Sequence, residues 1–132
     1  MIYVGNSQGI IRIFDYSEKE YKPIKAKETE GHSVCCIDVT KNGQYLVCGF
    51  KNGYVMLWDL GKWELKKMVT NAHSTSVLSI KFLKSTKLAV ISSDLAGNVS
   101  TIEFAKGIFL SSVNSTYLVS GCTAFALAPL FT

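Results

Sequence analysis

The chain has 132 residues, of which 48% are hydrophobic and 18% are charged, and its formal net charge is +4. This composition excludes an intrinsically disordered chain, and the length predicts one hydrophobic core or part of a larger one. The small positive charge does not point to nucleic acid, because it comes from scattered lysines of the kind that protect exposed strand edges.

The four cysteines lack the spacing of a metal or redox site. Cys35, Cys36, Cys48 and Cys122 contain no C-x-x-C pair. The first three lie in apolar runs, where a free cysteine behaves as a small buried hydrophobe, as in a reducing compartment. The sequence also holds no phosphate-binding glycine loop and no nucleophile or zinc-protease motif. We therefore expect no catalytic residue, no metal and no cofactor.

Residues 107–132 carry no charged side chain. A stretch of that length is long enough to span a membrane. Serine, threonine and asparagine residues interrupt it, however, together with Gly121 and Pro129. Two short strands, at 107–113 and 122–128, explain the segment better than a membrane span.

The sequence repeats with a period of 43 or 44 residues. Three stretches align: YVGNSQGIIRIFD (3–15), VCGFKNGYVMLWD (47–59) and ISSDLAGNVSTIE (91–103). Their glycines, Gly9, Gly53 and Gly97, recur every 44 residues, and Val34 and Val77 match in a second register 43 residues apart. A period in the low forties is typical of β-propellers and of helical repeats.

The repeat unit predicts strands rather than helices. Its apolar runs are four to seven residues long, rich in β-branched residues and bounded by turn signals such as Lys-Asn-Gly. We expect strands near 33–39, 44–49, 53–59 and 64–70 in the middle unit, and near 76–82, 87–92, 97–104 and 107–113 in the next. The predicted fold is all-β: a partial propeller of about three four-stranded antiparallel blades. Its units are an incomplete blade at 1–27, blades at 33–70 and 76–113, and the start of a further blade at 117–132.

The segment from Gly31-His32 to Trp58-Asp59 resembles a WD repeat, whose units carry GH near the start and WD at the end. In that family a His, a turn Asp, a strand Ser or Thr and the Trp form a hydrogen-bonded set, here called the staple. The resemblance implies a staple of His32, Asn52 and Trp58 in the middle blade, with Cys48 at the Ser/Thr position.

The third unit departs further from the WD pattern. It keeps His73, but Ala96 stands at the turn position and Ile102 at the tryptophan position. The staple is therefore expected to be lost there, which leaves packing to stabilise the blade.

A narrower resemblance rests on "CGF-x-x-G", on "AH" followed by "V-L-x-I-K-F", and on "S-D-x-x-G-x-V". From about residue 2 to residue 121 the chain resembles the N-terminal propeller of the vacuolar protein sorting-associated protein 8 family. The resemblance implies a fragment or truncated form of a subunit of CORVET, an endosomal vesicle-tethering complex. It also implies partners among other tethering subunits and a Rab-family GTPase, in the cytoplasm and peripherally on the endosomal membrane.

One exposed contact patch is predicted from the residues themselves. Trp63 lies beside Lys66 and Lys67 on the presumed outer strand, and an aromatic ring next to lysines is a plausible binding anchor. The alternative is that Trp63 packs on the neighbouring blade.

Two other functions stay open at this point. One is a WD-repeat scaffold of another pathway, such as a ubiquitin-ligase adaptor. The other is an enzyme or a nucleic-acid binder built on a propeller, which would need carboxylates or aromatic side chains clustered at the channel.

Overall fold

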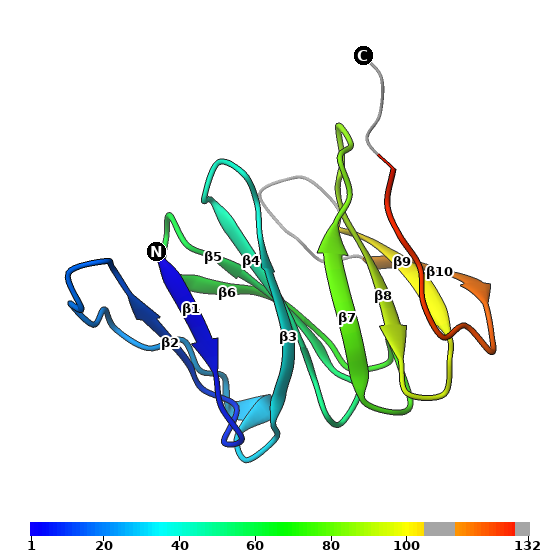
Figure 1. The fold of residues 1–132 in the computed structure, drawn as a ribbon, viewed down its shortest axis with the longest axis horizontal. Coiled ribbons are helices and arrows are strands. Elements are labelled where there is room, and N and C mark those ends of the chain that lie inside the picture. Colours follow the sequence, from blue (N-terminus) through cyan, green and yellow to red (C-terminus); the bar gives the residue numbers. More distant parts are fainter. Residues whose placement is uncertain (105–112, 129–132) are drawn as a thin grey trace.

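The structure, a computed structural model, describes residues 1–104 and 113–128, and its regular elements are strands and one short 3-10 helix. The described strands form three antiparallel sheets, one of two strands and two of four strands. Figure 1 shows the sheets side by side in chain order, as the blades of an incomplete propeller. The predicted all-β class and partial propeller are confirmed.

The first sheet pairs β1 (Ile2–Gly5) with β2 (Ile11–Phe14). Two isolated bridges, from Ile11 to Ile24 and from Phe14 to Glu20, extend this sheet by a third segment that is not a full strand. The 3-10 helix η1 (Lys27–Thr29) then leads into the middle blade. This sheet thus has two strands and one bridged segment, where the other two sheets have four strands.

The middle blade has the strand order β3-β4-β5-β6. Its strands are β3 (Val34–Val39), β4 (Tyr45–Phe50), β5 (Val55–Asp59) and β6 (Glu64–Val69). Each lies within two residues of its predicted bounds. At the turn between β4 and β5, Gly53 has φ of +90°, and a Cβ there would lie 2.2 Å from the carbonyl oxygen of His73. The recurrence of glycine in the sequence register therefore has a steric cause.

The third blade has the order β10-β9-β8-β7. Its strands are β7 (Val77–Phe82), β8 (Leu88–Asp94), β9 (Val99–Phe104) and β10 (Val113–Val119). The first three match the prediction. The fourth strand was expected at 107–113, but the described strand only begins at Val113; residues 107–112 lie outside the described residues.

The boundary of the predicted fourth blade also needs correction. Residues 117–119 belong to β10, where they pair with β9, so they do not open a new blade. Residues 122–128 form no strand in the structure. Their backbone nevertheless reaches the third blade, since the N–H of Cys122 donates a 2.9 Å hydrogen bond to the carbonyl of Gly97.

Two apolar clusters hold the blades together. One lies between the first and middle blades and includes Ile11, Ile13 and Trp58. The other lies between the middle and third blades and includes Leu57 and Val77. Because alternate residues of a strand point to opposite faces, β4 and β5 contribute side chains to both clusters.

Neighbouring blades approach each other closely where β1 and β4 each carry a glycine. A Cβ on Gly49 would lie 2.5 Å from a methyl group of Val77, and a Cβ on Gly5 would lie 2.5 Å from the equivalent methyl group of Val34. Both positions therefore require the absence of a side chain so that the next blade can approach. The corresponding residue of the third blade is Ser93.

The cysteines divide between core and surface. Cys48 is fully buried and Cys36 is partly buried, and burial raises the pKa of the Cys36 thiol to about 12 and that of Cys48 well above its usual range. Cys35 is exposed, contrary to the prediction that all three cysteines of the apolar runs are buried. It occupies a bulge, where the register of β3 against β4 shifts between Val34 and Cys36. The extra residue turns its side chain out of the core.

Candidate functional site

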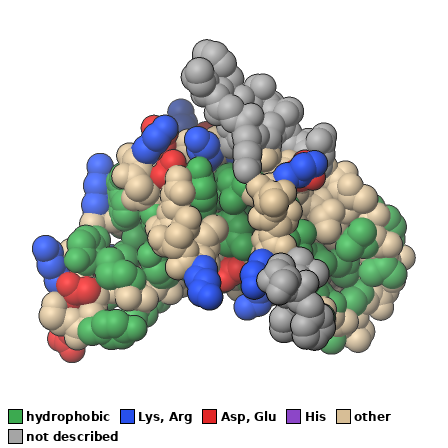
Figure 2. Space-filling view, turned by 90° about the horizontal axis from the view of Figure 1, so that it is seen from above, with side chains coloured by type: hydrophobic (Ala, Val, Ile, Leu, Met, Phe, Trp, Pro, Cys, Tyr) green, Lys and Arg blue, Asp and Glu red, His purple; other side chains and the backbone are tan. Residues whose placement is uncertain are grey.

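A groove of about 630 Å³ separates the middle and third blades at one rim. It opens between the β3–β4 turn (40–44) and the β7–β8 turn (83–87), and Lys66 of β6 also lines it. Both turns lie at the top of Figure 1, and Figure 2 views the molecule from that side, where basic side chains lie at several points beside exposed hydrophobic surface.

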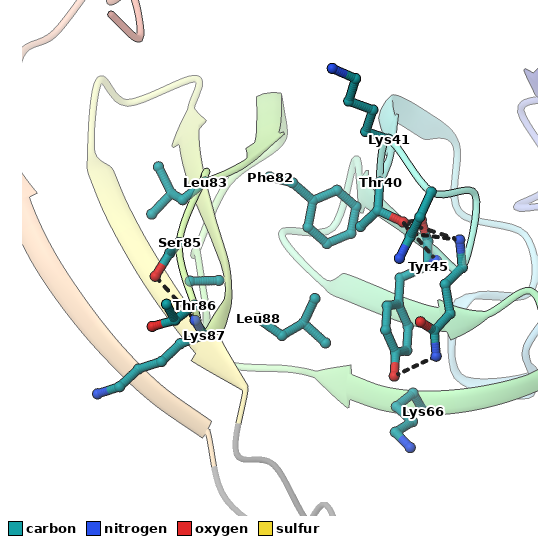
Figure 3. Close-up of a pocket in the computed structure, with 13 residues that line it drawn as sticks. Thr40, Lys41, Tyr45, Lys66, Phe82, Leu83, Ser85, Thr86, Lys87 and Leu88 are labelled. Atoms are coloured by element: carbon teal, nitrogen blue, oxygen red, sulfur yellow. Dashed lines mark hydrogen bonds between the residues drawn. The ribbon is translucent and has the colours of Figure 1, made fainter. Parts of the chain in front are cut away.

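The floor of the groove is apolar. Tyr45 of the middle blade lies opposite Phe82 and Leu88 of the third blade, as Figure 3 shows. All three side chains are partly buried and pack against the cluster between the two blades. The groove is thus the place where this interblade core meets solvent.

The rim of the groove is basic. Its described lining includes three lysines and no aspartate or glutamate: Lys41, Lys66 and Lys87. The ammonium group of Lys87 is engaged, since it lies 3.2 Å from a carboxylate oxygen of Glu103. Neither Lys41 nor Lys66 has an ion pair within the described part of the chain. In Figure 3 these two lysines lie beyond opposite ends of the apolar floor.

Hydrogen bonds fix the β3–β4 turn that carries Lys41. Oγ1 of Thr40 accepts the backbone N–H of Tyr45 at 3.0 Å, and Oδ1 of Asn42 accepts that of Gln44 at 3.0 Å. Nε2 of Gln44 also donates to the hydroxyl of Tyr45 at 3.3 Å. The side chains of this turn therefore fix the backbone of this wall of the groove.

The predicted contact patch is divided by the structure. Lys66 lines the groove, whereas Trp63 is half-buried and packs edge-on against Trp58, with ring centroids 6.1 Å apart and an interplanar angle of 85°. Trp63 precedes β6 and has φ of +57°, a left-handed backbone conformation. The expectation that its ring is an exposed anchor is not met. The contact role of Lys66 and Lys67 stays a prediction.

The structure does not join the predicted staple residues of the middle blade by hydrogen bonds. The side chain of His32 is exposed, and Oδ1 of Asn52 accepts the backbone N–H of Tyr54 at 3.2 Å. The Trp58 ring is buried as expected, but its Nε1 has no hydrogen-bond partner among the described residues.

The third blade contains the hydrogen-bonded set that the sequence was expected to lack. Nδ1 of His73 lies 2.7 Å from Oδ2 of Asp94, and its Nε2 lies 2.7 Å from Oγ of Ser92. The backbone N–H of Asn98 donates to Oδ1 of Asp94 at 3.0 Å. The prediction that this staple is lost in the third blade is therefore wrong.

A shift in register explains the error. His32 and His73 are 41 residues apart, but the flanking Val34 and Val77 are 43 apart. The residue 44 positions before His73 is the fully buried Thr29, and the turn Asp is Asp94 rather than the residue at position 96. The 44-residue register pairs Ser92 with Cys48, the assigned Ser/Thr position, but it pairs Asp94 with Phe50, so it identifies the serine of the set and not the aspartate.

The middle blade has an apolar version of the same site. Ser92 corresponds to Cys48 and Asp94 to Phe50, and Ile102 corresponds to Trp58. Cys48 and Phe50 are fully buried. At these equivalent positions the third blade thus has hydrogen-bonded polar side chains, whereas the middle blade has apolar side chains.

The His73 cluster has the composition of a hydrolytic triad but not its accessibility. Ser92 is fully buried, and Asp94 is 2% exposed. Burial acts to raise the pKa of Asp94, but hydrogen bonds from the backbone of Asn98 and from His73 outweigh it, so the pKa is lowered. A nucleophile needs contact with its substrate, which a sealed hydroxyl does not have. The cluster is structural.

The described residues bring together no group of three His, Cys, Asp or Glu side chains able to hold a metal ion. The same part of the chain contains no helix with the length and hydropathy needed to cross a membrane.

Comparison with known proteins places the chain in a family. The Vps8 beta-propeller family matches residues 1–132. Vacuolar protein sorting-associated protein 8 homologs are similar: the mouse protein is 30% identical over 125 residues and the human protein 28% identical over 127 residues. Each match covers 92% of this chain but only 9% of the relative.

Two other similarities are broader. A WD repeat-containing protein 55 homolog of Drosophila willistoni is 31% identical over 98 residues, covering 73% of this chain and 19% of that protein. The β-propeller domain of Cps50 (Swd1) from Myceliophteria thermophila superposes with a TM-score of 0.73 at 13% identity, covering 88% of this chain and 35% of that one. This last likeness concerns the fold alone. By its full-length family match, the chain belongs to the Vps8 beta-propeller family.

Proposed function

We propose that this chain is part of a vesicle-tethering subunit and acts by protein–protein contact in endosomal vesicle fusion and transport to the vacuole or lysosome. Its partners in this proposal are other tethering subunits and a Rab-family GTPase. It works in the cytoplasm and meets the endosomal membrane peripherally, through those partners.

The observation that carries the proposal is the match of all 132 residues to the Vps8 beta-propeller family. Recognition is also the activity that the described surface supports best. Its polar buried cluster is sealed around Ser92, whereas the interblade groove is open to solvent. Propellers with open rims commonly act as binding platforms, and the chemistry of such a rim sets its partner.

The test is a pull-down of GTP-loaded and GDP-loaded endosomal Rab proteins by the tagged 132-residue chain. Retention of a Rab in its GTP form alone is expected, together with co-purification of tethering subunits from a cell extract. A Lys66→Glu/Lys67→Glu pair should weaken retention. A Lys22→Glu/Lys25→Glu pair, which makes the same charge change on the first blade, should not. Equal retention of both nucleotide forms would contradict the proposal.

A WD-repeat scaffold of another pathway is the second candidate. The 31% identity with the WD repeat-containing protein 55 homolog favours it, because that match lies outside the Vps8 relatives. The same pull-down separates the two functions. Recovery of a ubiquitin ligase, with neither tethering subunits nor a Rab protein, would favour this second candidate.

A further inference from the structure

The groove between the middle and third blades combines a concave shape that is open to solvent with a charge pattern. Its volume of about 630 Å³ is that of a pocket for a few side chains rather than of a flat contact. The floor is formed by Tyr45, Phe82 and Leu88, which are already partly buried against the core. An apolar side chain placed there would therefore remove more apolar surface from water without moving the blades.

The positive charges lie on either side of that floor. Lys41 extends from the β3–β4 turn and Lys66 from β6, beyond opposite ends of the row of apolar side chains (Figure 3). Of the carboxylates near this groove, Glu103 pairs with Lys87, and Asp38 lies outside the groove lining, where its Oδ2 accepts the backbone N–H of Phe82. Two cations separated by an apolar floor are complementary to two anions separated by an apolar side chain.

We propose that this groove binds an acidic peptide segment with a large apolar residue at its centre. The central side chain lies over Phe82 and Tyr45, and the flanking carboxylates meet the ammonium groups of Lys41 and Lys66. A phospholipid headgroup matches the two lysines but leaves the apolar floor unfilled. The observations therefore favour a peptide over a membrane surface.

The site does not depend on the tethering proposal, because a peptide titration contains neither a GTPase nor a tethering subunit. The probe is a fluorescein-labelled hexapeptide, EEDFEE, titrated with the 132-residue chain and followed by fluorescence anisotropy. Saturable binding that weakens with added salt is expected. The analogue EEDGEE, which lacks the apolar side chain, should bind more weakly.

Two double variants separate the groove from overall charge. Lys41→Glu/Lys66→Glu should raise the Kd for EEDFEE by about tenfold, because two attractive contacts become repulsive. Lys22→Glu/Lys25→Glu makes the same change in net charge on exposed lysines of the first blade and should leave the Kd unchanged. Thermal melts of both variants confirm that they fold, and a Lys41→Gln/Lys66→Gln pair repeats the test with a milder change.

Several results would overturn the proposal. Equal weakening by both double variants would mean that binding follows net charge. Equal affinity for EEDFEE and EEDGEE would mean that the apolar floor contributes nothing to binding. The absence of saturable binding would show that the groove is not a peptide-binding site. Sedimentation with phosphatidylserine vesicles that depends on Lys41 and Lys66, without peptide binding, would assign the groove to a membrane surface instead.

Discussion

Oδ2 of Asp38 accepts a 2.8 Å hydrogen bond from the backbone N–H of Phe82, a residue 44 positions later in the sequence. Asp38 lies on β3 and Phe82 on β7, so the bond joins the middle blade to the third. It also holds the strand that carries one side of the groove floor. The blades are thus coupled by a specific polar contact as well as by apolar packing.

Replacing Asp38 should loosen this junction. Asp38→Ala leaves the N–H of Phe82 without its partner, and the free energy of unfolding should fall by about 1–3 kcal/mol, the usual cost of such a loss. Asp38→Asn keeps an acceptor oxygen and should cost less. Urea denaturation measures both, with Glu64→Ala on the exposed part of β6 as the control. Equal effects of Asp38→Ala and Glu64→Ala would show that the bond contributes nothing.

The two histidines should differ in the opposite order from that implied by the WD resemblance. His73→Ala leaves the buried Asp94 and Ser92 without a partner and should cost about 2–5 kcal/mol. The exposed His32 makes no side-chain hydrogen bond in the described structure, so His32→Ala should change stability by less than about 0.5 kcal/mol. Denaturant midpoints of the two variants provide the measurement. Comparable losses would mean that the His73 cluster is not a stabilising unit.

Acid should weaken the third blade through Asp94. Its pKa is lowered in the folded state, so its charged form stabilises the fold at pH values above its unfolded pKa of about 3.9. That contribution is lost as the pH falls through the lower, folded pKa. Unfolding free energies measured from pH 6 to pH 3 should therefore decline more steeply for the native chain than for Asp94→Asn. Parallel declines would exclude Asp94 as a source of the acid sensitivity.

Trp63 should behave as a core residue. Its ring packs edge-on against Trp58, and such aromatic pairs contribute about 0.5–1.5 kcal/mol beyond the area they bury. Trp63→Ala should therefore lower the melting temperature clearly, which calorimetry or circular dichroism detects. Trp63→Phe keeps an aromatic ring and should recover part of the loss. An unchanged melting temperature for Trp63→Ala would indicate that the Trp63 ring is exposed and does not pack in the core.

The thiols should react in an order set by burial. The raised pKa values of Cys36 and Cys48 keep both thiols protonated at pH 8, and Cys48 is also fully inaccessible. Iodoacetamide applied to the folded chain should modify the exposed Cys35 first, as peptide mass spectrometry detects. Addition of urea should abolish the difference. Equal modification of Cys35 and Cys48 without urea would contradict the buried position of β4.

The strands could be predicted because their signals are local and repeated. Alternating apolar residues and Lys-Asn-Gly turns fix most strand bounds, and the 44-residue recurrence of glycine marks a turn that only glycine fits, as at Gly53. The end of the third blade was less predictable. Residues 107–132 offer several uncharged, strand-like stretches, and no charged or alternating pattern selects Val113 as the start of β10.

The site could not be predicted in the same way. Ser92 and Asp94 look like ordinary strand-end residues until the register of His73 is known. The contact of Trp63 with Trp58 joins residues on either side of a turn, and the left-handed backbone at Trp63 is not signalled by a glycine or asparagine at that position. The groove arises from two turns on adjacent blades, so its volume and the spacing of Lys41 and Lys66 exist only after the blades have packed.

The division of the core into two interblade clusters has a consequence for how the protein unfolds. Each apolar cluster combines side chains of two neighbouring blades. The stability of the protein therefore comes from the interfaces between neighbouring blades, as in a repeat array. The strands β4 and β5 contribute side chains to both interfaces. Opening one interface leaves both strands packed against the other blade, so we expect their amide hydrogens to exchange slowly with solvent.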